Sequence, residues 1–271
     1  MSGARINTDG RLGVMLTELR LPTMKRLAAE SCDQADRESW PARRLLEHLF
    51  EQEMAEREVR RFDRHRAQSG LVADKRLSTF DFTAVPAISK AQITALAEGY
   101  DWLDHGSNIL AFGPPGSGKS HLLNGIGHAL IDAGKRVLFT RCSELVQRLQ
   151  GARRDLRLAN ELARLDRFDL LILDDISYVR KDQAETSVLF ELIAERYERK
   201  SIAITANTPF SRWSEVFVDA AMTIAAIDRL VHHATILEMN AESYRRRTAQ
   251  ADVSKARAAK KPAPASSDVG T

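Results

Sequence analysis

The chain has 271 residues, of which 44% are hydrophobic and 28% are charged, and its formal net charge is +3. This composition is that of a soluble globular protein with a substantial core, and the length suits one large domain and a smaller one. No apolar run approaches about 18 residues, residues 1–10 lack the apolar stretch of a secretory signal, and two cysteines are too few for a disulfide framework, so we expect a cytoplasmic protein with no membrane partner.

Residues 11–78 are predicted to be helical. An amphipathic face recurs at helical spacing near the start, Pro22 breaks or restarts the helix, and Pro41 suits the first turn of a long helix that runs to about residue 67. We therefore expect a small all-α domain over residues 1–68 that binds DNA or a partner protein. The amphipathic face consists of Leu12, Met15, Leu16 and Leu19.

Four arginines lie on one face of the second half of the long helix, within a sector about 100° wide. A basic stripe of this kind predicts contact with the phosphates of nucleic acid. Interleaved glutamates leave a second interpretation open, which is a solvated face with ion pairs along the helix. The stripe consists of Arg57, Arg60, Arg61 and Arg64.

Alternating strands and helices follow a predicted linker over residues 69–79. Short apolar strands are predicted at residues 108–112, 137–140, 170–173 and 202–205. Helices are predicted at residues 121–130, after a cap at Ser143, and at residues 187–199. Buried strands separated by helices indicate an α/β domain, a parallel sheet with helices on both faces, over residues 80–248.

The first predicted strand leads into the sequence G-P-P-G-S-G-K-S, a complete Walker A loop. Glycines let several backbone N–H groups approach a phosphate, Lys119 supplies a cation for the β- and γ-phosphates, and Ser120 supplies a hydroxyl for Mg²⁺. The loop and the helix after it predict that the chain binds ATP. The predicted ATP-binding residues are Gly113, Pro114, Pro115, Gly116, Ser117, Gly118, Lys119, Ser120 and His121.

Two further strand ends carry candidate catalytic residues. Asp174 and Asp175 end the strand at 170–173, where the first acid is suited to hold Mg²⁺ and the second to orient or deprotonate water. Asn207 follows the strand at 202–205 and is suited to hydrogen-bond the γ-phosphate or the water. In isolation the acids are also compatible with a solvated turn, and Asn207 with an ordinary turn residue.

In their order along the chain, these motifs and Asp228–Arg229–Leu230 resemble AAA+ ATPases of the initiator and helicase-loader clade. More narrowly, the chain resembles the IstB-like helper ATPases encoded beside the transposase in bacterial insertion sequences. The match spans about residues 11–248. It is carried by residues 16–24 (LTELRLPTM), 80–82 (FDF), 187–197 (SVLFELIAERY), 207–213 (NTPFSRW) and 226–233 (AIDRLVHH).

The resemblance implies that Asn207 is the sensor 1 residue and that Arg229 is an arginine finger for the nucleotide of a neighbouring subunit. A structural alternative for Arg229 is an ion pair with Asp219 or Asp228. Asp175 departs from the family pattern, which has Glu after the metal-binding Asp, and this favours slow hydrolysis. Arg245 is the nearest candidate for a sensor 2.

The initiator clade also places an extra helical element at residues 147–167, where it lines the oligomer and touches DNA. Arginines there would contact phosphates with little base readout, although interleaved acids leave a solvated face open. The candidates are Arg148, Arg153, Arg154 and Arg157, with Arg164 and Arg167 further along. After Tyr244 the chain becomes basic and low in apolar periodicity, which predicts a disordered tail over residues 249–271.

The resemblance thus implies an ATP-dependent regulator of transposition that forms a homo-oligomer on duplex DNA and recruits a transposase. A replicative helicase loader, with a helicase as its cargo, is the alternative. A small-molecule P-loop kinase is disfavoured because it has no use for Arg229 or for basic stripes.

Overall fold

The computed structural model describes residues 8–176, 182–209, 212–213 and 219–239, and contacts divide the chain into two compact units, 1–64 and 65–271. The predicted tail, Arg245 and the end of the predicted ATPase domain, residues 240–248, lie outside the described residues. Along the part of the chain that is described, no helix combines the length and the hydropathy needed to span a membrane.

The first unit consists of helices α1 (Thr8–Glu18), α2 (Pro22–Arg37) and α3 (Ala42–Ser69), and α3 passes into the second unit at His65. Pro22 occupies the first turn of α2, and Pro41 directly precedes α3. Of the apolar face predicted near the N-terminus, only Leu16 is buried, in a small core with Met24, Ala28 and Leu49. The other three leucine and methionine side chains of that face are exposed.

A buried carboxylate joins α3 to the start of α2. Glu53 is 2% exposed and accepts hydrogen bonds from the backbone N–H groups of Thr23 and Met24, at 2.8 and 3.1 Å. The first N–H groups of a helix have no partner within the helix. Glu53 supplies that partner from another helix and so holds α2 against α3.

The second unit contains a five-stranded sheet, counted over its described residues, in the order β2-β3-β4-β1-β5. All neighbouring strands are parallel. The strands predicted from the sequence are present, and β5 is an additional edge strand that the sequence did not predict, because its alternating and partly polar residues lack a continuous apolar run. The strands are β1 (Asn108–Phe112), β2 (Val137–Arg141), β3 (Leu170–Asp174), β4 (Ser201–Ala206) and β5 (Ala234–Glu238).

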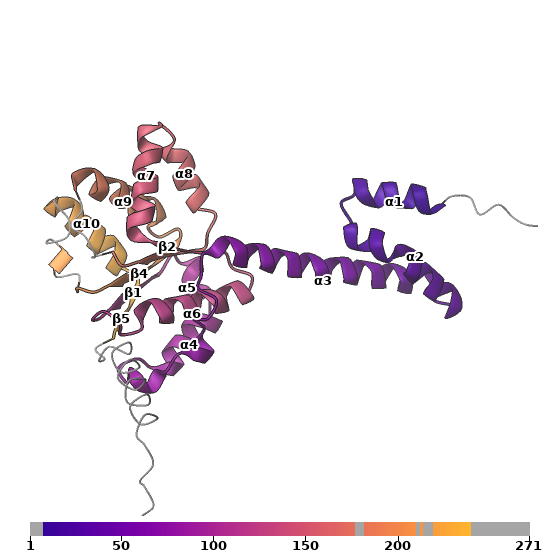
Figure 1. The fold of residues 1–271 in the computed structure, drawn as a ribbon, viewed down its shortest axis with the longest axis horizontal. Helices are drawn as coiled ribbons and strands as arrows, with labels where there is room; N and C mark the ends of the chain where they lie inside the picture. The colour runs from indigo at the N-terminus through magenta and orange to yellow at the C-terminus, as the bar shows by residue number, and fades with distance from the viewer. Residues whose placement is uncertain (1–7, 177–181, 210–211, 214–218, 240–271) are drawn as a thin grey trace, which may run out of the picture. The chain divides into compact units, whose positions relative to one another are not determined.

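Helices cover both faces of this sheet (Figure 1). Ile109 and Ala111 of β1 point to the core beneath α4 (Lys90–Glu98), α5 (Asp101–Asp104) and α6 (Lys119–Asp132). Leu110 and Phe112 point to the core beneath four other helices. Those helices are α7 (Cys142–Arg154), α8 (Leu158–Leu165), α9 (Gln183–Arg196) and α10 (Ala220–Val231). The arrangement is the α/β fold predicted from the sequence.

The segment that follows α3, which includes the predicted linker at residues 69–79, packs against α6. The Val72 N–H donates to Oδ1 of Asn124 at 2.8 Å, and the Val72 carbonyl oxygen lies 2.9 Å from Nε2 of His128. A Cβ at Gly125 would lie 2.7 Å from Leu77, so the close approach requires glycine there. Two 3₁₀ turns, η1 (Leu77–Thr79) and η2 (Phe82–Ala84), complete the segment.

The predicted cap of α7 at Ser143 is wrong. The helix begins one residue earlier, at Cys142, and its N-cap is Arg141, which makes no side-chain capping hydrogen bond. Strand β2 runs directly into α7, so there is no loop in which Ser143 could serve as a cap.

Candidate functional site

The predicted phosphate loop joins the end of β1 to α6 and borders a cavity of about 330 Å³. Gly113, Gly116 and Gly118 have φ angles of 149°, 85° and 95°, which residues with a Cβ rarely adopt. A Cβ at Gly113 would lie 2.4 Å from the Met239 carbonyl oxygen, and one at Gly118 would lie 3.1 Å from the Phe80 ring. The glycines are therefore required by the backbone, and Gly118 leads directly into the helix N-terminus that faces the cavity.

Lys119 is 6% exposed, and its ammonium group is held inside the loop. Nζ donates hydrogen bonds to the carbonyl oxygens of Gly113 and Pro114, at 2.7 and 2.9 Å. Gly113 and Pro114 thus anchor the lysine, while residues 115–121 line the cavity itself. Ser117 Oγ is buried and has no hydrogen-bond partner among the described residues.

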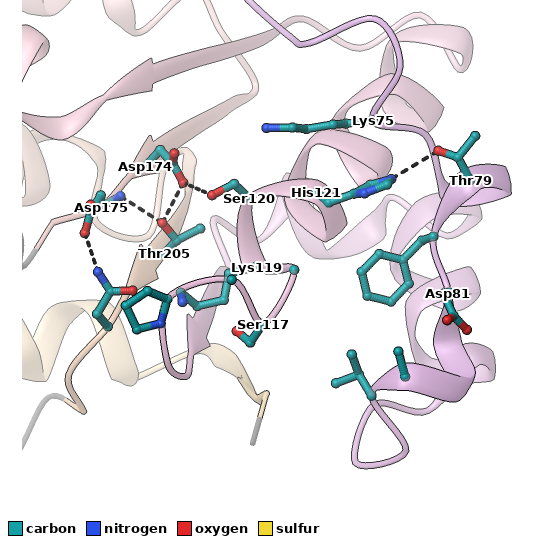
Figure 2. A pocket seen from close by; sticks show the side chains of 17 residues that line it. Lys75, Thr79, Asp81, Ser117, Lys119, Ser120, His121, Asp174, Asp175 and Thr205 are labelled. Carbon is teal, nitrogen blue, oxygen red and sulfur yellow. Dashed lines mark hydrogen bonds between the residues drawn. The ribbon is translucent and has the colours of Figure 1, made fainter. Parts of the chain in front are cut away.

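Asp174, at the end of β3, lies beside the first turn of α6 (Figure 2). The Ser120 hydroxyl donates to Asp174 Oδ1 at 2.6 Å, and the Thr205 hydroxyl donates to the same oxygen at 2.7 Å. A hydroxyl and a carboxylate in contact are the oxygen ligands that Mg²⁺ prefers. The two residues predicted to hold the metal are thus brought together by the fold, and their chemistry fits that ion.

Asp175 follows with φ of 61°, in the left-handed region where Asp and Asn are more frequent than most other side chains. Its N–H donates to Thr205 Oγ1 at 2.8 Å, and its Oδ1 accepts a hydrogen bond from Asn207 Nδ2 at 3.0 Å. The turn therefore directs the second acid toward Asn207, and both line the cavity.

The opposite wall of the cavity comes from residues 75–85, which the sequence did not predict as ligand-binding. His121 faces this wall. Its Nε2 lies 3.1 Å from both Thr79 Oγ1 and the Arg76 carbonyl oxygen, and its ring meets the edge of Phe80. Figure 2 shows the Lys75 side chain directed over the cavity toward Ser120. His121 thus braces the wall, and Lys75 adds a second cation.

Arg229 lies on α10 and does not line this cavity. Its guanidinium group lies 5.0 Å from the centre of the Phe190 ring and donates to the Ala225 carbonyl oxygen at 3.3 Å. Among the described residues it forms no ion pair with Asp219 or Asp228. Asp219 instead caps α10 by accepting from the Met222 N–H at 2.9 Å.

The arginine stripe on α3 divides into two pairs. Arg57 and Arg60 bind the buried Glu53, at 2.8 and 3.3 Å, and Arg60 also donates to the Thr23 hydroxyl at 3.0 Å. These two arginines therefore stabilise the helical unit, which agrees with the alternative interpretation of ion pairs along the helix. Arg61 lies 3.6 Å from the exposed Glu58, and Arg64 is exposed.

The arginines of α7 and α8 divide in the same way. Arg148 pairs with Glu161 at 2.8 Å, and Arg153 binds Ser187 and Glu191. The turn between the helices is more open: Arg154 is exposed, Arg157 pairs with the exposed Asp155, and the intervening Leu156 is 94% exposed with φ of 56°.

Thr205 is the central residue that the sequence analysis missed. It is 1% exposed in β4, and its single hydroxyl contacts both the Asp174 carboxylate and the Asp175 N–H. The only signal in the sequence was a polar residue within an otherwise apolar strand. The pairing of β3 with β4 decides that this residue lies beside Asp174.

Comparison with known proteins identifies the relatives of the chain. The family model described as IstB-like ATP binding protein matches residues 14–252. A protein of Sinorhizobium fredii, named as an ATP-binding protein of an insertion sequence, is 63% identical over 89% of this chain and 81% of its own length. The ATP-binding protein named for insertion sequence IS21 of Pseudomonas aeruginosa is 36% identical, over 86% of this chain and 88% of its own length.

Solved structures share the fold. The DnaC helicase loader has a TM-score of 0.50 and 19% identity over 55% of this chain and 87% of that one. AMPPCP-bound DnaA from Aquifex aeolicus has a TM-score of 0.54 and 16% identity over 69% of this chain and 57% of that one. With the glycine loop, the strand-end acids and the sheet described above, these matches show that the chain belongs to the family of IstB-like ATP-binding proteins, with a P-loop domain of the AAA+ fold.

Proposed function

We propose that this protein is an ATPase that assembles on duplex DNA and recruits or stimulates a transposase. The observation that carries the ATPase part is the connected set of hydrogen bonds from Ser120 through Asp174, Thr205 and Asp175 to Asn207. This set links a candidate metal ligand to a candidate base and to a candidate sensor at the mouth of one cavity.

Each residue then has a distinct role in phosphoryl transfer. Lys119 and the loop N–H groups bind the phosphates, and Asp175 orients the attacking water. Ser120 and Asp174 would hold Mg²⁺, which would supply positive charge to neutralise the charge that develops on the phosphates. Asn207 restrains the Asp175 carboxylate and reports on the γ-phosphate. Because Asp is shorter than Glu, we expect the water to be held less closely and hydrolysis to be slow, which suits a switch.

In the proposed assembly, the Arg229 guanidinium group of one subunit supplies a further positive charge to the ATP site of its neighbour. Arg229 is directed neither to its own cavity nor to a carboxylate among the described residues, which supports a role toward the nucleotide of a neighbouring subunit. A guanidinium group added in trans stabilises transition-state charge only when subunits associate. Hydrolysis would then depend on the oligomer.

DNA contact is proposed for the turn between α7 and α8, where Arg154 and Arg157 are exposed, and for Arg61 and Arg64 of α3. Transposition is proposed because both relatives described above are named for insertion sequences. Helicase loading remains the second candidate, since the DnaC loader shares the fold.

A pull-down separates the two candidates. The protein is incubated with duplex DNA and either the transposase or the replicative helicase of its host, with ATP, ADP or no nucleotide. We expect ATP-dependent retention of the transposase and none of the helicase. Retention of the helicase alone would favour the helicase-loader function. Equal retention of a partner with ATP, ADP and no nucleotide would contradict an ATP-dependent switch.

A further inference from the structure

A second cluster of ligand-type side chains lies where α9 and α10 end. Nδ1 of His232 lies 3.6 Å from Oε1 of Glu198, and Nε2 of His233 lies 3.7 Å from the same oxygen. One ligand atom from each of the three residues lies within 4.8 Å of the other two. All three side chains are half exposed, so the cluster is open to solvent.

The backbone holds these residues in place. Glu198 has φ of 56°, a strained value for a residue with a side chain, and packs against Gly106, where a Cβ would lie 2.8 Å from the Glu198 carbonyl carbon. The His233 carbonyl oxygen accepts from the Asn108 N–H at 2.8 Å, which ties the histidine pair to β1. The cluster therefore joins two helix ends to the sheet.

The cluster is distinct from the nucleotide cavity. Strand β5 begins directly after His233, and β1 begins at Asn108, so the cluster lies where the parallel strands begin. The phosphate loop follows the other end of β1, about 17 Å away for a strand of this length. A cation bound here cannot be the Mg²⁺ of the ATP site.

The donor atoms and their spacing select the kind of cation. Two ligands bound at about 2.0–2.1 Å around a tetrahedral ion lie about 3.4 Å apart, close to the 3.6 and 3.7 Å observed. Two imidazoles and one carboxylate favour zinc and its neighbours in the transition series over Mg²⁺ or Ca²⁺, which prefer oxygen.

A tyrosine contacts one of the donor atoms. The Tyr197 hydroxyl lies 2.8 Å from Nδ1 of His232. A cation at the cluster would replace this tyrosine contact at Nδ1.

We propose that Glu198, His232 and His233 form a binding site for a divalent transition metal of the zinc class. Three protein ligands leave at least one position open to water or another donor. Because the ligands come from the ends of α9 and α10, the bound metal clamps these helices together, including the helix that carries Arg229.

Cobalt is the probe, because its visible absorption reports coordination by nitrogen. The full-length chain without an affinity tag is titrated with Co²⁺ in excess Mg²⁺ and without nucleotide, so that the oxygen ligands of the ATP site are occupied. We expect one equivalent of Co²⁺ to bind and Zn²⁺ to displace it. His233→Ala and Glu198→Gln should each weaken binding more than about tenfold, since even the hydrogen-bond partner of a ligand contributes that much.

His48→Ala, which removes a histidine from α3 in the other unit, is the matched control and should bind Co²⁺ as the wild type does. A second readout is thermal: Zn²⁺ should raise the Tm of the wild type and of the control but not that of either ligand variant. Unfolded variants are recognised by circular dichroism, and His232→Ala then replaces them. Equal Co²⁺ affinity in the ligand variants and the control, or no uptake by the wild type, would overturn the proposal.

Discussion

At the scale of single residues, Thr205 controls the geometry of both acids through one oxygen atom. Its hydroxyl donates to Asp174 and accepts from the Asp175 N–H. Removing the hydroxyl takes away the Thr205 partner of that partly buried N–H, which costs up to about 1–3 kcal/mol. The backbone contacts of β4, including the bond from the Ile176 N–H to the Thr205 carbonyl oxygen, do not depend on the side chain.

We therefore predict that Thr205→Val binds ATP nearly as well as the wild type but hydrolyses it about tenfold more slowly, since about 1.4 kcal/mol corresponds to a factor of ten in rate. Single-turnover hydrolysis and nucleotide titration measure the two effects separately. Thr205→Ser keeps the oxygen and should retain most of the rate. If Thr205→Val hydrolyses ATP as fast as Thr205→Ser does, the Thr205 hydroxyl has no role in hydrolysis.

In contrast to the buried Thr205, Leu156 has a side chain that contributes little to the stability of the fold. It is 94% exposed with φ of 56°, a conformation that costs a residue with a Cβ roughly 1–2 kcal/mol. We predict that Leu156→Gly leaves the Tm unchanged or raises it by about 1–3 °C. Leu149→Ala, in the same helical hairpin and fully buried, should instead cost about 2–5 kcal/mol. A clear loss of stability in Leu156→Gly would show that the side chain packs against something.

At the scale of elements, the helical unit depends on a carboxylate that caps one helix from another. Burial by itself raises the pKa of Glu53, but hydrogen bonds from Arg57 and from the N–H groups of Met24 and Thr23 outweigh it and hold that pKa below its ordinary value. A carboxyl group whose pKa is lower in the folded state than in the unfolded state stabilises the fold at any pH above its unfolded-state pKa. This stabilisation is lost as the pH falls through the folded-state pKa.

We predict that the helical unit loses stability below about pH 4.5 and that Glu53→Ala costs on the order of 2 kcal/mol at neutral pH, because two N–H groups lose their partner. Glu51→Ala removes an exposed acid from the same helix and serves as the control. Helix content followed by circular dichroism against pH and urea tests both statements. Identical acid unfolding of the wild type and Glu53→Ala would contradict them.

The turn between α7 and α8 gives the second prediction at this scale. Arg154 is exposed there and Arg157 pairs with the exposed Asp155, whereas Arg148 and Arg153 pair with acids of the neighbouring helices α8 and α9. Each phosphate contact adds about 0.9 to the slope of log affinity against log salt. The Arg154→Ala, Arg157→Ala double variant should therefore lower the slope for duplex DNA by about two. An unchanged slope would exclude the turn as a DNA contact. The Arg61→Ala, Arg64→Ala double variant tests in the same way whether the stripe on α3 contacts DNA.

At the scale of the whole molecule, the proposed chemistry requires more than one subunit. Arg229→Ala keeps Lys119 and the loop intact, so it should bind ATP but hydrolyse it poorly, since an arginine finger contributes about 10³–10⁵-fold in other systems. Lys119→Ala has a defective cavity but an intact Arg229. We predict that mixing these two inactive proteins restores part of the ATPase activity.

The mixing experiment also has a clear negative outcome. If Arg229 acts only through its contacts with Phe190 and Ala225, the mixture stays inactive and Arg229→Ala lowers the Tm. Mixing two preparations of Lys119→Ala controls for residual turnover. An inactive mixture would remove the support for a finger in trans, although ATP binding through residues 113–120 would be unaffected.

The sequence by itself determined those features whose chemistry is local. Lys119 and the loop glycines occur at consecutive positions, so their spacing alone specifies a phosphate-binding turn. Strands β1, β3 and β4 were recognised because strands buried on both faces are continuous apolar runs, and β2 was recognised from its short apolar run Val137–Leu138–Phe139. Asp174, Asp175 and Asn207 were recognised because they directly follow such runs.

Only the tertiary structure decided what lies beside these residues. The contact of Thr205 with Asp174 depends on the pairing of β3 with β4, and the wall at residues 75–85 depends on packing against α6. The pairing of Glu53 with Arg57 was one of the alternatives open in the sequence, whereas the burial of Glu53 against the first turn of α2 was not. The meeting of Glu198 with the histidine pair joins segments more than thirty residues apart, and such contacts arise from the packing of the whole chain, which a local sequence pattern does not encode.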